Sequence, residues 1–191
     1  GVLAPKSKAD LAFTMHILSW LAVNGTAAIV EFPGVLYRGG AEAKIRKYLI
    51  DNNYVDAVIQ LPPDLFFGTT IVTCIIVLKK SKKDNAVLFI DASAEFKRFG
   101  NKNKLTGQNQ ANVLDKFTAR ADVDHVARLV SSEDIAANDY NIAVSSYVEA
   151  KDTREVIDIT ELNARIEQIV ARQAELRESI DAIVADLEGA K

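Results

Sequence analysis

LPPDLFFGTTIVTCIIVLK, residues 61–79, is the stretch that decides the fold class of this chain. Its second half, residues 71–78, is rich in β-branched residues and has almost no polar alternation. Such a run is typical of a strand covered on both faces, in a sheet with helices on each side. Phe66, Phe67 and a glycine precede the strand. The two rings either present a stacking surface to a ligand at the mouth of the strand or plug the edge of the core.

Helices and strands alternate before this stretch. Residue spacing predicts, in order, a helix over 8–23, a short buried strand at 27–30, a helix around 45–49 and a strand at 55–59. Ser7 and Asp10 are spaced as a capping box for the first helix. In the second helix, apolar spacing directs Ile45 inward and Arg46 to the opposite, mostly charged face.

After residue 60 the order changes. The strand of the opening stretch and a strand at 87–90 follow one another with no helix between them. A helix at 112–119, a strand at 126–130 and a short helix capped by Ser131 and Asp134 complete the region. This order predicts an α/β fold, a doubly wound sheet with an antiparallel strand at one end.

Residues 96–110, FKRFGNKNKLTGQNQ, are expected to form a polar loop. Basic side chains alternate there with two aromatic rings. Such a loop either holds nucleic-acid phosphates while an aromatic ring stacks on a base, or is simply solvated. The candidate phosphate ligands are Lys97, Arg98, Lys102 and Lys104, and the rings are Phe96 and Phe99.

Composition excludes several classes of protein. The net charge is −3, so a nucleic-acid contact needs a local basic patch rather than a global field. The one cysteine, Cys74, lies in the apolar strand and is expected to act as a small buried hydrophobe. No apolar run is long enough to predict a membrane span, and no signal-peptide pattern is present. The expected location is cytoplasmic.

The tail of the chain has a different pattern. Apolar residues step alternately by three and four from residue 159 to 187, and only Gln173 interrupts them. Asp158 and Glu161 can cap the start of this helix, which would span roughly 45 Å. Its apolar seam therefore either docks on another molecule, another copy or another part of the polypeptide, or folds back on its own domain. The expected docking residues are Leu162, Ile166, Ile169, Leu176, Ile180, Ile183 and Leu187.

Two parts are therefore expected, an α/β domain over 1–150 and a linker with a heptad-patterned helix over 151–191. Catalytic, cofactor-binding and metal-ligating residues are not found by motif. No Gly-x-Gly-x-x-Gly follows a strand, and neither clustered metal ligands nor a nucleophile–histidine pair occurs. Residues 61–64, LPPD, superficially match the Asn/Asp-Pro-Pro-aromatic tetrad of amino-methyltransferases. Leu61 and Asp64 supply neither its side-chain oxygen nor its ring.

Taken together, several blocks resemble the modification subunit of type I restriction–modification systems. They are residues 4–13 (APKSKADLAF), 25–30 (GTAAIV), 34–42 (GVLYRGGAE), 61–78, 89–93 (FIDAS) and 138–142 (NDYNI). The resemblance implies transfer of a methyl group from S-adenosylmethionine to N6 of adenine in DNA, on a doubly wound methyltransferase sheet. It also implies a specificity subunit and a restriction subunit as partners.

The family's Gly-rich cofactor motif and catalytic tetrad precede the matched region, so the resemblance is to the later strands of the sheet and the tail. The chain alone is expected to be inactive and to bind no cofactor. By analogy with related enzymes, Phe67 is expected to stack on the flipped target adenine, with Phe66 as the fallback. The alternatives are a non-catalytic assembly module that docks through the tail, and a methyltransferase directed to another nucleotide or to RNA.

Overall fold

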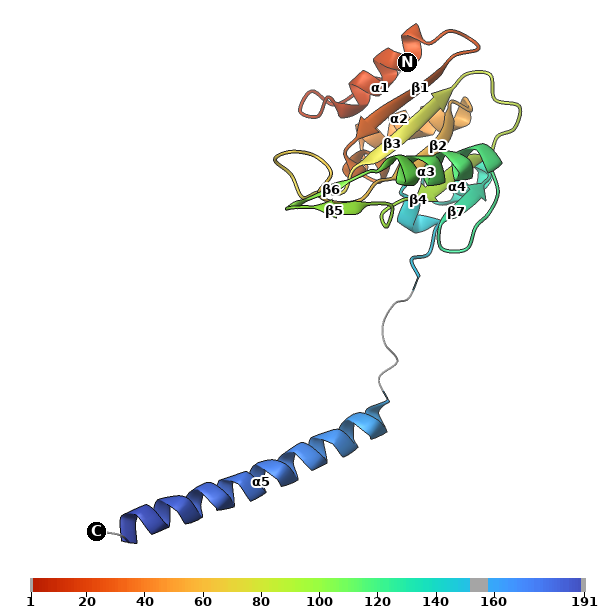
Figure 1. The fold of residues 1–191 in the computed structure, drawn as a ribbon. Helices are drawn as coiled ribbons and strands as arrows, with labels where there is room; N and C mark the ends of the chain where they lie inside the picture. Colours follow the sequence, from red (N-terminus) through yellow and green to blue (C-terminus); the bar gives the residue numbers. More distant parts are fainter. Residues whose placement is uncertain (1, 152–157, 190–191) are drawn as a thin grey trace. The chain divides into compact units, whose positions relative to one another are not determined.

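The structure is a computed structural model that describes residues 2–151 and 158–189. It contains two compact units, Gly1–Lys151 and Asp152–Lys191 (Figure 1). The linker expected at 151–157 lies outside the described residues, apart from Lys151. Each unit is described by itself below.

The first unit is a mixed α/β structure. Its helices are α1 (Asp10–Trp20), α2 (Ala41–Asp51), α3 (Gly107–Ala119) and α4 (Ser132–Ala137), with 3-10 helices η1 (Pro33–Leu36) and η2 (Val144–Ser146). Its strands are β1 (Thr26–Glu31), β2 (Val55–Gln60), β3 (Cys74–Lys79), β4 (Val87–Asp91), β5 (Lys97–Phe99), β6 (Lys102–Lys104) and β7 (Ala127–Val130).

Five strands form the main sheet, in the order β1-β3-β2-β4-β7. The strands β2 and β4 are parallel, whereas β3 is antiparallel to both β1 and β2. An antiparallel strand was expected at one end of the sheet. Such a strand does lie at one edge, as β7, but β3, the antiparallel strand that follows β2 without a helix, lies inside the sheet. Strands β1 and β2, joined through α2, are therefore parallel to one another and are separated by β3. The edge strand β7 is antiparallel to β4.

Strand β3 confirms the prediction of a doubly covered strand. Ile76 and Leu78 face one core, and Val77 faces the other. The strand begins at Cys74 rather than at residue 71, and Ile71 lies exposed in the preceding loop. Helices cover both faces of the sheet. Apolar residues of α1, α2 and α4 pack into the first core, and those of α3 line the second (Figure 1).

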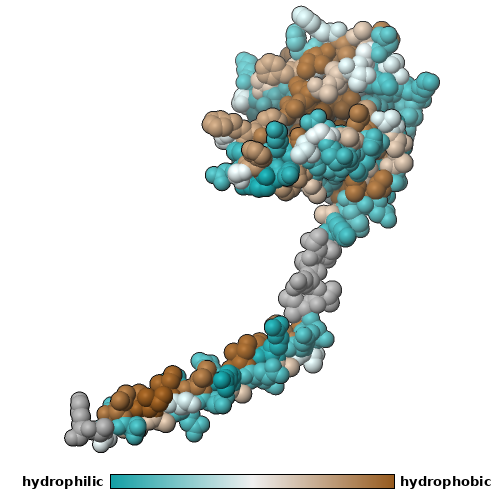
Figure 2. Space-filling view, viewed as in Figure 1, coloured by the Kyte–Doolittle hydropathy of each residue, from teal (hydrophilic) through white to brown (hydrophobic). Residues whose placement is uncertain are grey.

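Strand β1 corrects the prediction of a buried strand. It is an edge of the described sheet, and its side chains alternate between exposed and half-buried until the buried Glu31. On the α3 face, Ala28 borders an apolar groove of about 460 Å³ that also includes Ile75, Val77, Val113 and Phe117. Figure 2 shows this apolar surface beside α3.

Two predictions about the helices are wrong. No side chain caps the start of α1, whose N-cap residue is Ala9, so Ser7 and Asp10 form no capping box there. Arg46 is only 2% exposed and does not lie on an outer face. Its guanidinium donates to the carbonyls of Tyr140 at 2.8 Å, Val35 at 2.9 Å and Arg38 at 2.7 Å. Arg46 thus ties α2 to two loops through backbone acceptors that apolar spacing cannot reveal.

The expected polar loop at 96–110 is instead a β-hairpin followed by the first turn of α3. Strands β5 and β6 pair antiparallel, and Gly100 turns the chain between them with φ 58°. Helix α3 begins five residues earlier than predicted, at Gly107 rather than residue 112, with a capping box between Thr106 and Asn109. Asn at the third helical position takes the role that Glu or Gln usually plays.

The second unit consists of helix α5 (Ile159–Gly189). The predicted cap is confirmed for Asp158, whose carboxylate accepts from the backbone N–H of Thr160 at 2.8 Å and Glu161 at 3.4 Å. Apolar residues form a stripe along the helix (Figure 2). Among the described helices, none is both long enough and apolar enough to cross a membrane.

Candidate nucleic-acid interface

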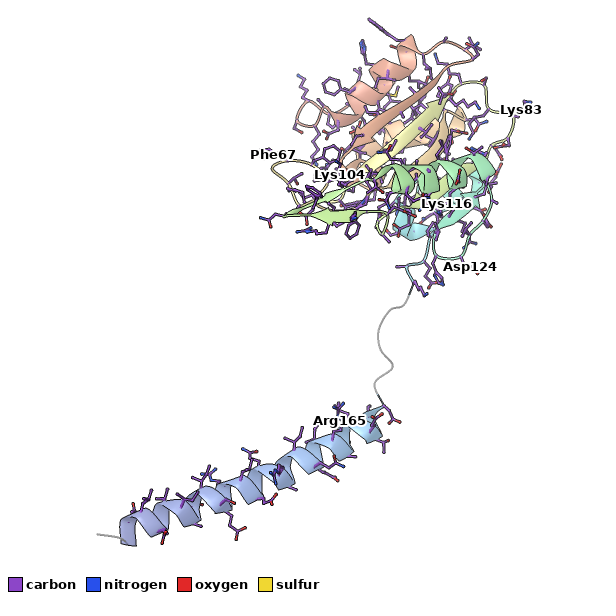
Figure 3. All side chains as sticks on the ribbon, in the orientation of Figure 1. Phe67, Lys83, Lys104, Lys116, Asp124 and Arg165 are labelled. Carbon is purple, nitrogen blue, oxygen red and sulfur yellow. The ribbon has the colours of Figure 1, made fainter. Side chains whose placement is uncertain are left out.

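The aromatic loop joins β2 to β3 over residues 61–73. At its base the N–H of Leu61 donates to the carbonyl of Thr73 at 2.9 Å, and Leu61 is buried. At its tip Phe67 is completely exposed, with a relative accessibility of 101%, and Phe66 is 41% exposed. Figure 3 shows Phe67 at the outer end of the loop. Phe67 therefore does not plug the core.

Two left-handed residues bring the rings to the tip. Asp64 has φ 57° and Gly68 has φ 78°, so the chain reverses on both sides of Phe66 and Phe67. A short polar side chain such as Asp tolerates this conformation better than other non-glycine residues. The sequence LPPD is therefore the start of a shaped loop, and it is not a catalytic tetrad.

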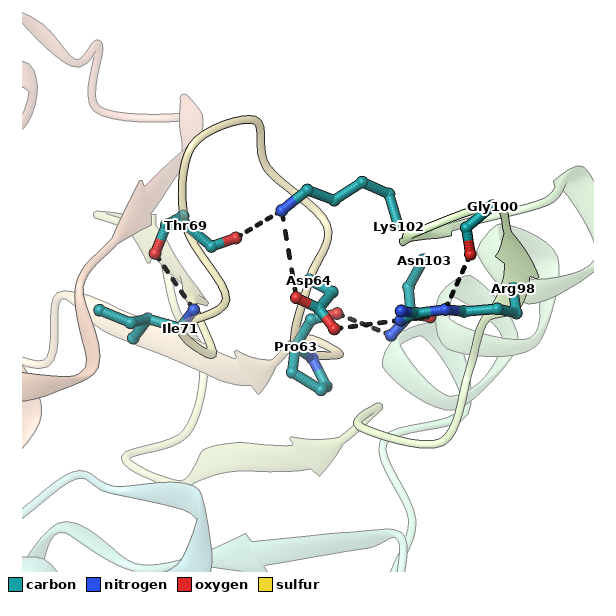
Figure 4. A network of polar contacts seen from close by, with 8 residues as sticks. All are labelled: Pro63, Asp64, Thr69, Ile71, Arg98, Gly100, Lys102 and Asn103. Carbon is teal, nitrogen blue, oxygen red and sulfur yellow. Dashed lines mark hydrogen bonds and ion pairs between the residues drawn. The ribbon is translucent and has the colours of Figure 1, made fainter.

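The β5–β6 hairpin supports this loop from one side (Figure 4). Asn103 is 6% exposed and donates its side-chain amide to the carbonyl of Pro63 at 2.8 Å. Its backbone N–H donates to the carbonyl of Asp64 at 3.1 Å. Lys102 donates to the carbonyl of Thr69 at 2.8 Å. The loop is thus held on both sides of the rings by the same hairpin.

Charged groups complete the contact. The Arg98 guanidinium lies 3.0 Å from the Asp64 carboxylate and also donates to the side-chain oxygen of Asn103 at 3.1 Å. Lys102 lies 4.0 Å from the other carboxylate oxygen of Asp64. Of the four basic residues predicted to hold phosphates, Arg98 and Lys102 are therefore already bound to the aromatic loop.

The other two basic residues, Lys97 and Lys104, are paired directly across the hairpin and are exposed. Like charges in this arrangement destabilise a hairpin unless an anion lies between them. No acidic side chain among the described residues is within ion-pair distance of either ammonium. Lys104 lies 5.9 Å from the ring of the exposed Phe99. The hairpin thus presents two cations and a ring to solvent. Figure 3 labels one of these cations, Lys104.

Glu95 fixes the base of the hairpin to α3. One carboxylate oxygen accepts from the side-chain amides of Asn109 at 3.0 Å and Asn112 at 3.1 Å, and Lys116 lies 3.8 Å from the other. These hydrogen bonds, that of Asn109 first, and the Lys116 ammonium hold the pKa of the Glu95 carboxyl below its usual range. The hairpin is therefore attached to a helix of the core as well as to the loop.

The buried titratable groups nearest the loop belong to the core. Burial raises the pKa of the Cys74 thiol to about 12, and its Sγ donates to the carbonyl of Glu31 at 3.4 Å. Burial also raises the pKa of the Glu31 carboxyl, which accepts from the Thr14 hydroxyl at 2.6 Å. Cys74 is a buried small hydrophobe, as predicted.

After β1 the chain enters η1, whose Val35 and Leu36 are buried in the core. Gly39 and Gly40 follow and lead into α2, with Gly40 as its N-cap residue at φ 70°. Within the described ranges, no group of three His, Cys, Asp or Glu side chains is arranged to hold a metal ion.

The sequence model described as N-6 DNA Methylase matches residues 1–156. This chain belongs to the N-6 DNA methylase family. The chain is 46% identical over 188 residues to the methylase subunit of the type I restriction enzyme MpnII from Mycoplasma pneumoniae, covering 98% of this chain and 35% of that protein. The chain spans about a third of the length of the curated relatives it matches.

Solved structures give the same result for this methylase-family chain. It is 45% identical to a type I restriction–modification methyltransferase subunit from Streptococcus thermophilus, with a TM-score of 0.75 over 77% of this chain and 32% of that chain. A structure from a study of type I system assembly shares the fold at 18% identity, with a TM-score of 0.63 over 93% of this chain and 40% of that chain. The resemblance to type I modification subunits is confirmed.

Sequence reasoning about this family member found the rings and the basic residues but missed how they are joined. Asn103 and Asp64 were not singled out as site residues, although Asn103 is the most buried member of the contact. The one feature of the sequence that could have indicated this role is that Asn103 lies between two lysines, close to the turn at Gly100. The seam residues of α5, Leu162 to Leu187, are all exposed in the unit described by itself.

Proposed function

We propose that the full-length subunit containing this chain transfers a methyl group from S-adenosylmethionine to N6 of adenine in DNA, within a type I restriction–modification complex. The observation that carries the proposal is the fully exposed Phe67 ring, on a loop anchored by a hairpin that also carries an exposed pair of lysines. A solvent-exposed ring on a supported loop is suited to stacking on a base. Membership of the N-6 DNA methylase family supports adenine as that base.

Stacking explains why a ring should be presented in this way. An enzyme that modifies a base inside a duplex turns that base out of the helix and must compensate for its lost stacking. Stacking of a base on an aromatic ring is worth about 1–3 kcal/mol. Phe67 supplies this contact in the proposal, and Phe66, half as exposed, is the second candidate.

Lys97 and Lys104 are the proposed phosphate contacts. A DNA phosphate between the two ammonium groups would relieve their mutual repulsion. Both groups would remain in contact with water at the edge of the hairpin. Arg98 and Lys102 are less available for this role, because their charges are directed at Asp64.

The chain supplies one part of the methyltransferase domain in this proposal. Its five strands act as the later half of a doubly wound methyltransferase-type sheet, and the open edge of β1 and the groove beside α3 are suited to packing against further strands and helices. Because neither the family's Gly-rich cofactor motif nor its catalytic tetrad occurs in this sequence, we assign S-adenosylmethionine to the rest of the full-length subunit. The chain alone would then be inactive.

Helix α5 is the proposed docking element for the specificity subunit, and through it for a complex with the restriction subunit. Its apolar seam is exposed along the whole unit, and a helix of this length needs a partner along that seam. Self-association of two such helices is the competing outcome. A purely structural docking module would share this seam but would not require an exposed Phe67.

The test uses the full-length subunit with its specificity subunit, labelled S-adenosylmethionine and DNA, followed by identification of the methylated nucleoside. The proposal expects N6-methyladenine with the wild type and a rate reduced about 5- to 150-fold for Phe67→Ala. Assembly should be unchanged in that variant. Methylation of a base other than adenine, or a wild-type rate for Phe67→Ala together with Phe66→Ala, would overturn it.

A further inference from the structure

The hairpin carries two different sets of basic and polar residues. Lys97 and Lys104 are directed to solvent, whereas Arg98 and Asn103, opposite one another in the next pair, contact the aromatic loop. Lys102, which alternation places on the same face as Lys104, also contacts the loop, so the two sets share one short hairpin without occupying separate faces. One rigid element therefore joins the proposed phosphate contacts to the proposed base contact.

Asn103 joins the hairpin to the aromatic loop through its backbone N–H, its side-chain amide and its side-chain oxygen. Its N–H and its side-chain amide donate to consecutive carbonyls of the loop, those of Asp64 and Pro63, and its side-chain oxygen accepts from Arg98. Buried polar groups that are all satisfied in this way fix a single geometry. Without them the residues between Leu61 and Thr73 would keep the hydrogen bond at the base of the loop, the local turn at Thr69 and the side-chain contacts of Arg98 and Lys102.

The Asp64 carboxylate completes the connection three residues from Phe67. It lies 3.0 Å from Arg98 and 4.0 Å from Lys102, while Lys102 also binds the loop at Thr69, two residues beyond Phe67 (Figure 4). Partly shielded, hydrogen-bonded ion pairs of this kind constrain geometry more than they stabilise the fold.

We propose that Asp64, Arg98 and Asn103 are positioning residues that hold Phe67 in register with the phosphates bound by the hairpin, so that the ring meets the flipped adenine. This inference rests on the proposed function of Phe67. Small errors in the placement of a reacting group reduce rates strongly, up to roughly 100-fold for about 1 Å. A loop tip free to move would lose part of that effect.

The test is Asp64→Asn in the full-length subunit bound to its specificity subunit. Asparagine tolerates the left-handed backbone at this position, so the change removes the charge and leaves the turn intact. The probe is a duplex that contains the recognised sequence, which sequencing of methylated host DNA identifies. Single-turnover methylation and the Kd for the duplex are measured separately.

We expect the single-turnover rate to fall about tenfold. The Kd for DNA should stay the same or fall, because Arg98 and Lys102 are released toward phosphates. A general loss of structure would weaken both quantities, so this split distinguishes positioning from folding. In the Phe67→Ala background, Asp64→Asn should have no further effect on the rate, because it acts through the ring.

The matched control is Asp51→Asn, which removes the acid of a comparable pair, Lys47–Asp51 at 2.9 Å on α2. It should leave both the rate and the Kd unchanged. A second variant, Asn103→Ser, should reproduce the slower methylation of Asp64→Asn.

Three outcomes separate the claims. A wild-type rate for Asp64→Asn, with Phe67→Ala impaired, overturns the positioning role alone. Additive losses in the double variant also overturn it. A wild-type rate for Phe67→Ala overturns the stacking role of Phe67, and the positioning role with it, whereas the proposed function is overturned only if Phe66→Ala also keeps the wild-type rate.

Discussion

The seam of α5 gives a prediction whose size can be worked from the structure. The change is Ile166→Glu with Ile169→Glu, two neighbouring seam positions that are 49% and 66% exposed in the helix by itself. Fully burying an isoleucine side chain stabilises a protein by about 1.5–3 kcal/mol. A partner helix that covers the exposed half to two thirds of each side chain therefore contributes roughly 1–2 kcal/mol per residue.

Loss of both contacts should weaken binding of the specificity subunit by about 2–4 kcal/mol, or about 30- to 900-fold in Kd. The two carboxylates add a desolvation penalty, so this range is a lower bound. The assay is surface plasmon resonance between the full-length subunit and the immobilised specificity subunit. Methyl transfer at saturating concentrations of both subunits should survive.

The control is Ala164→Glu with Ala171→Glu. It adds the same charge to the same helix on the face opposite the seam, and both alanines are exposed. This variant should bind as the wild type does. If the seam variant keeps the wild-type Kd, or if both variants weaken binding equally, the assignment of the docking face is wrong.

Three further predictions concern the first unit. Arg46→Met should lower the free energy of unfolding of the full-length subunit by about 3 kcal/mol, because three carbonyls lose a charged donor; an unchanged denaturant midpoint would contradict this. Burial raises the pKa of the Cys74 thiol to about 12, and the thiolate is the reactive form. Alkylation of Cys74 should therefore be slow at pH 8, and its rate should still rise with pH above pH 9. Mass spectrometry of the Cys74 peptide measures this rate, and a plateau near pH 9 would refute the prediction. Lys97→Met and Lys104→Met should each weaken DNA binding and reduce the slope of log Kd against log salt by about 1, and an unchanged slope would exclude a phosphate contact.

How much of this the sequence could predict depended on the kind of signal. The buried strand β3 was predictable because burial of both faces leaves an unbroken apolar run. Its place between β1 and β2 was not predictable, because the apolar run does not indicate which strands will pair with it. For the same reason β1 was predicted to be buried. The sequence does not show that only one strand pairs with it, at an edge of the described sheet.

Polar contacts were the least predictable part of the site. The hairpin has strands of three residues, too short for alternation to be recognised, so its residues were expected to form a polar loop. Arg46 was placed on an outer face because helical spacing assigns charged residues to solvent, while its acceptors are backbone carbonyls of other segments. The exposure of Phe67 likewise depends on the left-handed backbone conformation of Asp64. No pattern of side chains in the sequence predicts that conformation.

The most direct test of the central claim, that Phe67 stacks on the target adenine, is the single-turnover methylation rate of the full-length subunit across Phe67→Tyr, Phe67→Leu and Phe67→Ala. The account predicts a rate close to that of the wild type for tyrosine, which keeps the ring. It predicts a reduction for leucine and a larger one for alanine, up to about 150-fold. Equal rates for all three variants would contradict it.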